Sequence, residues 1–230
     1  MRAYRTNVAN LGFALVVSSS AIAAADKTEA AKKPGTITGT VKVTETDGKP
    51  VGNLDVIVYL VGPTDASGPK QTSIEQKNRT FVPDLVAVTV GDTVVFPNRD
   101  SNLHNVFSPK PKFDLGTLKK GEGTDKPQKF DKQGVVDVYC NIHPEMAATI
   151  LVLPNRHYTR TANGTFELTD VPPGSWKLFA YTKRATKPAS VDITVVEDGK
   201  ATANLAIVRG AEAPHPDKFG GKYSGSKGYP

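Results

Sequence analysis

The segment VDVYCNIHPEM, residues 136–146, carries the most information about this chain. It begins with the apolar pattern of a β-strand and then places Cys140, His143 and Met146 at the spacing C-x2-H-x2-M. Cys140 is the only cysteine among 230 residues, and Met146 is the only methionine besides the first residue. A cysteine with no partner for a disulfide is either a buried apolar residue or a metal ligand.

A fourth donor stands 36 residues upstream of the cysteine, at His104. One thiolate, two imidazoles and a weak thioether are the ligands of a type 1, or blue, copper site. Structural zinc sites are built from several Cys or His side chains, so zinc fits this set less well. We therefore predict one copper ion per chain, with the metal ligands His104, Cys140, His143 and Met146.

Each of the three residues in the segment also has an ordinary structural interpretation. Cys140 could be a buried strand residue, Met146 could fill the core, and His143 could cap the turn that Pro144 begins. Accepting all three requires the only cysteine, the only internal methionine and a histidine to fall within seven residues by chance. Metal ligation is the better interpretation.

Apolar and polar residues alternate along most of the chain. Residues 35–62 alternate on both sides of Asp47-Gly48, and residues 81–98 alternate on both sides of Gly91-Asp92. Such alternation indicates strands, and both dipeptides are turn signals. No segment has a convincing helical period, which predicts an all-β protein built from β-sandwiches.

The residues around the expected ligands resemble the cupredoxins. His104-Asn105-Val106-Phe107 is similar to the cupredoxin His-Asn motif, and YCNIHPEM is similar to its Cys-His-Met loop, with the spacing of amicyanin. The wider pattern resembles the plastocyanin and pseudoazurin group and covers residues 74–153. This resemblance implies a Greek-key β-sandwich with copper near one end. It also implies that Asn105 hydrogen-bonds across to the ligand loop and keeps the site rigid.

The flanking segments show a second resemblance. Residues 35–73 and 154–209 look like the two halves of a carboxypeptidase regulatory-like, Ig-like β-sandwich, through Gly-x-Phe followed by Val-Pro-Pro-Gly at residues 164–174. The cupredoxin domain would then be inserted in this discontinuous sandwich, an architecture similar to that of methylamine-utilisation proteins. The resemblance implies a module that holds or presents the copper domain. Residues 210–230, rich in Gly, Pro and Lys, are predicted to be a disordered tail.

Residues 1–25 have the features of a signal peptide. They carry Arg2 and Arg5, then an apolar stretch, then Ala23-Ala24-Ala25 as a small-residue cleavage site. The apolar stretch is shorter than the ~20 residues that a membrane-spanning helix needs. We therefore expect cleavage and a periplasmic or otherwise exported protein with no remaining membrane span. Residues 26–34 are charged and are predicted to be a flexible leader.

Charge excludes one class of partner. Without residues 1–25 the chain keeps 27 basic and 23 acidic side chains, a net charge of +4. The basic residues are scattered among acidic ones, so nothing indicates nucleic-acid binding. A mild positive charge is compatible with docking to an acidic protein redox partner.

These features favour a single-electron carrier that cycles between Cu(II) and Cu(I), and not an enzyme. Multicopper enzymes need further histidines, and only His157 and His215 remain, both expected to be surface residues. The alternatives are a copper-binding or delivery protein without redox turnover and a purely structural β-module. Delivery proteins usually carry Met- or His-rich surfaces, whereas this chain has two Met and four His. The redox partner and the oligomeric state stay open at this point.

Overall fold

The computed structural model describes residues 32–52, 54–64 and 67–221. All regular structure in these residues is β-strand, seventeen strands in total, so the all-β prediction is confirmed. Nothing in the described part of the chain is a helix long and apolar enough to cross a membrane. The predicted signal peptide, residues 1–25, and leader residues 26–31 lie outside the described residues.

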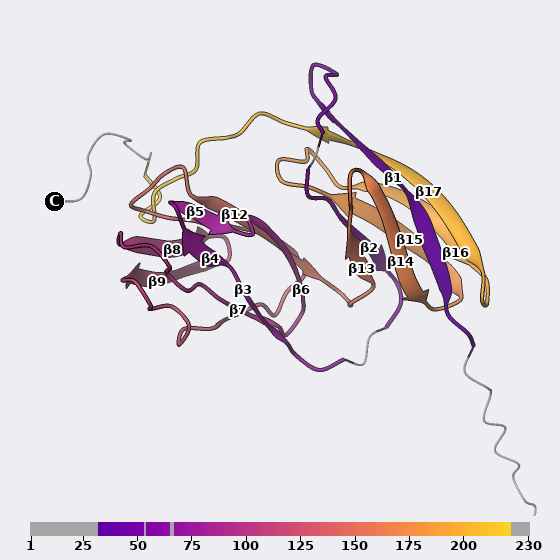
Figure 1. The fold of residues 1–230 in the computed structure, drawn as a ribbon, viewed down its shortest axis with the longest axis horizontal. Helices are drawn as coiled ribbons and strands as arrows, with labels where there is room; N and C mark the ends of the chain where they lie inside the picture. Colours follow the sequence, from indigo (N-terminus) through magenta and orange to yellow (C-terminus); the bar gives the residue numbers. More distant parts are fainter. Residues whose placement is uncertain (1–31, 53, 65–66, 222–230) are drawn as a thin grey trace, which may run out of the picture. The chain divides into compact units, whose positions relative to one another are not determined.

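One group of strands forms two sheets, with the orders β14-β1-β17 and β13-β2-β15-β16 (Figure 1). The bounds are β1 Gly35–Glu45, β2 Ile57–Val61, β13 Tyr158–Arg160, β14 Thr165–Val171, β15 Gly174–Tyr181, β16 Ala189–Val195 and β17 Lys200–Arg209. Segments at the two ends of the described chain therefore share one sheet, because β1 pairs in parallel with β17. The two strands approach so closely that a Cβ at Gly39 would lie 1.7 Å from the carbonyl oxygen of Ala203.

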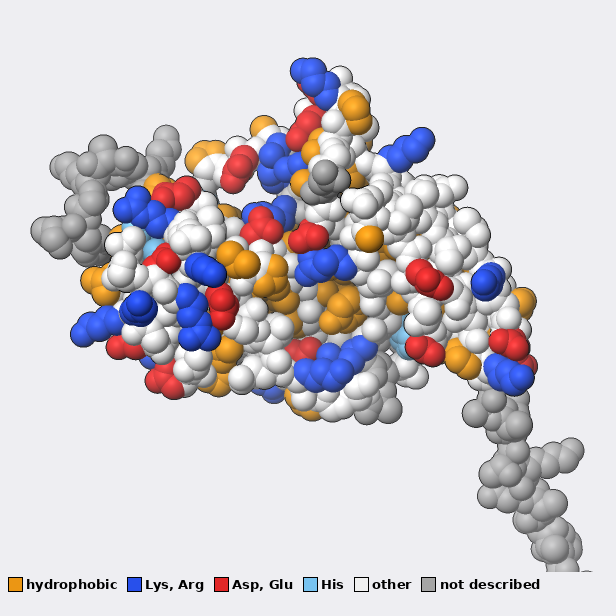
Figure 2. All heavy atoms as spheres, in the orientation of Figure 1, with side chains coloured by type: hydrophobic (Ala, Val, Ile, Leu, Met, Phe, Trp, Pro, Cys, Tyr) orange, Lys and Arg blue, Asp and Glu red, His pale blue; other side chains and the backbone are white. Residues whose placement is uncertain are grey.

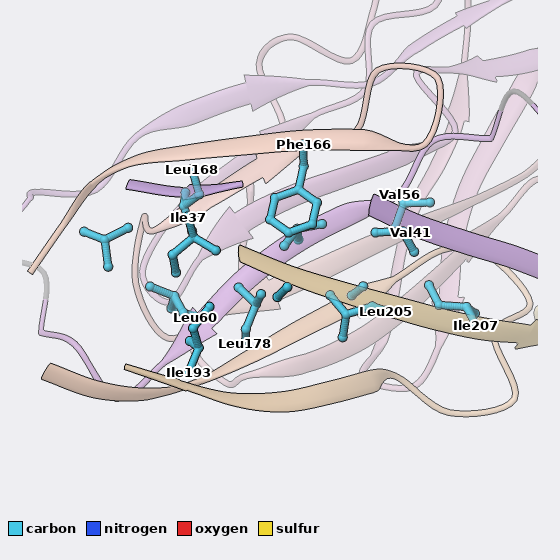
Figure 3. Packing of buried hydrophobic residues seen from close by; sticks show 14 of the residues in the cluster. Ile37, Val41, Val56, Leu60, Phe166, Leu168, Leu178, Ile193, Leu205 and Ile207 are labelled. Atoms are coloured by element: carbon cyan, nitrogen blue, oxygen red, sulfur yellow. The ribbon is translucent and has the colours of Figure 1, made fainter. Parts of the chain in front are cut away.

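The core of this group consists of the inward residues of the alternating strands. Ile37, Val41, Leu178 and Leu205 are buried members of one apolar cluster that draws on both sheets. Figure 3 shows these side chains pointing into the space between the strands. The period-two pattern therefore sets which face of each strand is buried.

A second group of strands forms a five-stranded sheet, β6-β12-β11-β8-β9, a three-stranded sheet, β10-β7-β3, and the hairpin β4-β5. The bounds are β3 Gln71–Ser73, β4 Glu75–Lys77, β5 Thr80–Val82, β6 Leu85–Thr89, β7 Thr93–Val95, β8 His104–Pro109, β9 Lys112–Leu118, β10 Gln128–Lys129, β11 Gly134–Tyr139 and β12 Ala147–Leu153. Their shared core is a separate apolar cluster that includes Phe96, Val106 and Ile150.

β3 belongs to this second group, because it pairs in parallel with β7 through Gln71, Thr72 and Ser73. These three residues lie within 35–73, the range that the sequence predicts for the flanking sandwich. A third apolar cluster joins residues of β2 and β15 to residues of β6 and β12, and it includes Tyr59, Leu85 and Leu151. The two groups are therefore packed together by side chains on the outer faces of their sheets.

Residues 210–230 were predicted to be a disordered tail. The part of this segment that the structure describes, up to Gly221, is instead held against the protein. In Figure 1 this yellow segment runs from the end of β17 to the strands of the second group. It makes specific hydrogen bonds there: the backbone N–H of Lys218 donates to Asn141 Oδ1 at 2.9 Å, and His215 Nε2 lies 2.9 Å from the carbonyl oxygen of Pro144. We call residues 211–221 the strap. A segment rich in Pro and Gly shows no apolar period in its sequence. Its side chains can nevertheless hold it in place through specific contacts.

Candidate metal centre

Two neighbouring strands of the five-stranded sheet position the predicted ligands. His104 is the first residue of β8, and the loop from Cys140 to Met146 joins β11 to β12. β8 and β11 run antiparallel and pair through Phe107 and Tyr139. The beginning of β8 therefore lies beside the end of β11, and this register brings His104 next to Cys140.

Three of the four predicted ligands meet at one point. The Nδ1 atoms of His104 and His143 are 3.0 Å apart, and Cys140 Sγ is 3.9 Å from His143 Nδ1. One ligand atom from each of the three residues lies within 4.8 Å of the others. His104 and Cys140 are fully buried, while His143 is partly exposed. A buried thiol and two converging ring nitrogens form a cluster that can hold a metal ion.

The loop that carries the other ligands is closed by its own backbone. The N–H of Met146 donates to the carbonyl oxygen of His143 at 3.0 Å, and the N–H of Cys140 donates to the carbonyl oxygen of Met146 at 3.2 Å. Pro144 occupies the second position of this turn, where its fixed φ suits the geometry. Met146 is fully buried in the same apolar cluster as Cys140. The loop thus joins Cys140 and Met146 through their backbones and buries both side chains in one cluster.

Asn105 contacts the centre through its backbone. Its N–H donates to Cys140 Sγ, at the start of the ligand loop, at 3.4 Å. Its side-chain amide lies elsewhere and donates to Asp114 Oδ1 and to the carbonyl oxygen of Gly116, both at 2.8 Å on β9. Asn105 therefore ties β8 to β9 with its side chain and supports the sulfur with its main chain.

A carboxylate that sequence analysis did not identify lies on the far side of His104. Asp100 Oδ2 is 2.8 Å from His104 Nε2. Burial alone would raise the pKa of Asp100, but the N–H of Arg79, His104 and the N–H of Asn78 together lower the pKa below its usual value. Asp100 is therefore ionised at neutral pH. The only signal in the sequence was an acidic residue four positions before the first histidine.

The surroundings of His143 disfavour its charged form. Burial lowers its pKa below the usual value for histidine, and the neighbouring His104 and Arg79 lower it further. A neutral imidazole offers a lone pair at its unprotonated nitrogen, which metal ligation requires.

The two histidines outside the predicted ligand set lie in different places. The backbone N–H of His157 donates to Asn155 Oδ1, and the residue takes no part in the cluster. His215, on the strap, stacks on Tyr139, the residue before Cys140, with ring centroids 4.0 Å apart. Neither is a ligand in this geometry, but His215 contacts the surroundings of the site more closely than expected of a surface residue.

Comparisons with known proteins give structural likenesses alone. No protein-family model and no curated protein matches the chain. A purple cupredoxin from Nitrosopumilus maritimus is 25% identical, with 35% of this chain and 98% of that chain covered and a TM-score of 0.32. A reduced amicyanin variant is 26% identical, with 35% and 80% covered and a TM-score of 0.33. A copper-containing nitrite reductase from Thermus scotoductus SA-01 is 24% identical, with 40% and 23% covered and a TM-score of 0.33. All three TM-scores lie below 0.5.

Proposed function

We propose that this chain is an exported single-electron carrier with one type 1 copper ion held by His104, Cys140, His143 and Met146. The observation that carries this proposal is the convergence of two imidazole Nδ1 atoms and one thiol within 4.8 Å, in a region where the thiol is fully buried. The buried thioether of Met146 lies at the end of the same short loop. The sequence motifs of residues 104–107 and 139–146, which resemble those of cupredoxins, support the same assignment.

The donor set fits copper better than other metals. Thiolate and thioether sulfurs favour Cu(I), whereas imidazole nitrogens also suit Cu(II). Copper bound by this set would supply a one-electron couple between the two states. Zinc sites are mostly tetrahedral sets of Cys and His, or of His and carboxylate, and do not explain a buried methionine in the same loop as the thiol.

The protein frame around the ligands is suited to electron transfer because it resists rearrangement. The turn of the ligand loop is closed by two backbone hydrogen bonds, and Asn105 fixes β8 to β9 on the opposite side. Ligands held in one arrangement cannot relax far when the charge of a bound ion changes by one. This lowers the barrier to adding or removing an electron.

His143 is the exposed side of the site. It is partly exposed, as is Ile142, while Pro144 and Glu145 are exposed. His104 and Cys140 are buried, so a partner protein could approach the ligand set most closely at His143. We infer that electrons enter and leave through its ring.

The proposed partner is another redox protein. Figure 2 shows acidic and basic side chains interspersed over the visible face, without a broad area of one sign. A mixed surface of this kind does not favour nucleic acid, which requires a continuous basic surface. The signal-peptide features of residues 1–25 support export, and we propose a periplasmic or equivalent location.

The alternative is a copper-binding or delivery protein with the same ligands. Delivery requires that copper reach an acceptor, and the burial of Cys140, Met146 and His104 hinders a direct ligand exchange. An enzyme would need further copper ligands, and the one cluster of His, Cys and acidic residues found in the described residues is the site already given. These observations support the carrier over both alternatives.

Voltammetry of the copper-loaded full chain, combined with a chelator challenge, separates these functions. A carrier gives a reversible one-electron wave and keeps its copper through repeated oxidation and reduction in the presence of a Cu(I) chelator. The Cys140→Ala variant is the matched control and should give no wave. Rapid transfer of copper to the chelator, with no reversible wave from the wild-type chain, would establish delivery and overturn the proposal.

A further inference from the structure

The hydrogen bond between Asp100 and His104 lies on the side of the ring that faces away from the ligand cluster. His104 Nδ1 points toward His143, whereas His104 Nε2 is 2.8 Å from Asp100 Oδ2. The His104 side chain is fully buried, and the Asp100 side chain is 11% exposed. A charged acceptor thus contacts a predicted ligand in a region with little water.

The carboxylate of Asp100 is itself held in place. The backbone N–H groups of Asn78 and Arg79 donate to Oδ1 and Oδ2 at 2.6 Å and 2.9 Å. These two residues form the tip of the β4-β5 hairpin, and their φ angles of 53° and 54° are those of a type I′ turn. The turn therefore presents two N–H groups to one carboxylate, and Asp100 orients that carboxylate toward the ring.

The carboxylate of Asp100 does not stabilise the turn in which Asp100 lies. The turn at this point is stabilised by the side chain of Asn98, whose Oδ1 accepts the backbone N–H of Asp100 at 2.8 Å. The carboxylate of Asp100 is not needed for this turn. Its contacts among the described residues are with the hairpin tip and with His104 Nε2. Two of these groups are backbone N–H donors, and the third, His104 Nε2, donates when the ring carries its proton there. Such a set suits an ionised carboxylate, which only accepts.

We propose that Asp100 is a positioning residue that fixes His104 for copper and lowers the reduction potential of the centre. The inference rests on the proposed function. A proton shared between Nε2 and the carboxylate leaves the lone pair of Nδ1 for the metal, so the ring has one tautomer and one orientation. The negative charge also makes the imidazole a stronger donor. A stronger donor stabilises Cu(II) more than Cu(I), because the oxidised ion carries the greater charge.

Asp100→Asn is the first test, because it removes the charge while keeping the shape. We expect a loss of Cu(II) affinity of about 10- to 100-fold, as for other partners of metal-binding histidines. The loss of Cu(I) affinity should be smaller, so the potential rises. Each tenfold difference between the two losses corresponds to ~59 mV for a one-electron couple. Asp100→Glu, which keeps the charge on a longer stem, should recover part of the shift.

The matched control is Asp131→Asn, which removes the same charge from an exposed carboxylate that pairs with Lys129. It should leave the potential and both copper affinities unchanged. A wild-type chain with a reversible copper wave and an Asp100→Asn variant with the wild-type potential would overturn the role of Asp100 alone. A wild-type chain that shows no type 1 copper signal would overturn the proposed function and this inference with it.

A measurement on the metal-free wild-type chain keeps the inference testable if Asp100→Asn does not fold. Nitrogen-15 NMR of the histidine rings reports which nitrogen carries the proton. His104 should be wholly protonated at Nε2, with Nδ1 free, and a mixture of tautomers at His104 would overturn the proposal.

Discussion

The imidazole ring of His215 stacks on the phenol ring of Tyr139, with centroids 4.0 Å apart and an interplanar angle of 13°. Tyr139 is the last residue of β11 and immediately precedes Cys140. The same imidazole reaches the carbonyl oxygen of Pro144 through Nε2. One side chain of the strap therefore contacts both the residue that precedes the ligand loop and Pro144 within the loop.

The first prediction concerns this contact. His215→Ala should destabilise the chain by about 1 kcal/mol, the typical value of a stacked pair of rings. A loss of this size lowers the melting temperature by about 2 to 4 °C in a protein of this length. The loosened loop should also release copper faster to a chelator. Thermal unfolding and stopped-flow competition measure the two effects.

His157→Ala is the control for the strap, because it removes a histidine that takes no part in the ligand cluster. It should leave the rate of copper release unchanged. If His215→Ala and His157→Ala release copper at the same rate as wild type, the strap does not hold the loop.

The second prediction concerns Met146. Met146→Leu keeps an apolar side chain of similar size in this fully buried position, so the fold should be preserved. The weak axial thioether is lost, which leaves three donors. Because Cu(I) accepts a lower coordination number more readily than Cu(II), the reduction potential should rise. The thiolate absorption should persist. A potential equal to that of wild type would show that Met146 is a core residue and not a ligand.

The third prediction separates the two roles of Asn105. Asn105→Ala removes the side-chain bonds to Asp114 and Gly116 but keeps the backbone N–H that donates to Cys140 Sγ. The loss of two hydrogen bonds should cost about 2 kcal/mol of unfolding free energy. The absorption spectrum of the copper form should change little. A strongly shifted spectrum with unchanged stability would mean that the side chain acts on the metal and not on the frame.

The parts of this centre that could be predicted from the sequence are those whose residues lie close together along the chain. Cys140, His143 and Met146 lie in one loop of seven residues, so their spacing alone indicated a ligand set. Strand alternation indicated the all-β fold, because burial on one face leaves a direct trace in the sequence. His104 could be added since the ligand set lacked a second imidazole.

The remaining parts depend on tertiary contacts that leave little trace in the sequence. Asp100 contacts His104 only because a hairpin tip some twenty residues upstream fixes its carboxylate. The strap has no apolar period, and contacts of a few side chains, among them His215 and Lys218, hold it in place. β3 is only three residues long, so its pairing with β7 was not visible as a pattern.

The fourth prediction concerns stability against acid. Asp92 is 3% exposed and accepts two hydrogen bonds from the guanidinium of Arg156, at 2.7 Å and 3.0 Å. Burial alone would raise the pKa of Asp92, but Arg156 and the N–H groups of Thr89 and Lys70 lower it well below its usual range. The carboxylate therefore stabilises the fold above an unfolded pKa of about 3.9, and this contribution is lost as the pH falls toward the folded pKa.

Asp92→Asn should accordingly cost about 3 to 5 kcal/mol at neutral pH, because it leaves a guanidinium that is largely buried without its counter-charge. The cost should shrink below about pH 4, where the wild-type carboxylate begins to lose its advantage. Denaturant unfolding at several pH values measures both. Asp55→Asn, which breaks the more exposed pair with Arg160, should cost at most about 1 kcal/mol at any pH. Equal costs for the two variants would contradict this account of the buried pair.

The most direct measurement of the central claim is a titration of the metal-free full chain with Cu(II), followed by absorption and EPR. A His2Cys site with a weak methionine predicts an intense thiolate-to-copper band at about 600 nm. The band should saturate at one copper per chain and be absent in Cys140→Ala. A chain that binds Cu(II) without colour, or that binds it equally well after Cys140→Ala, would contradict the assignment of this site.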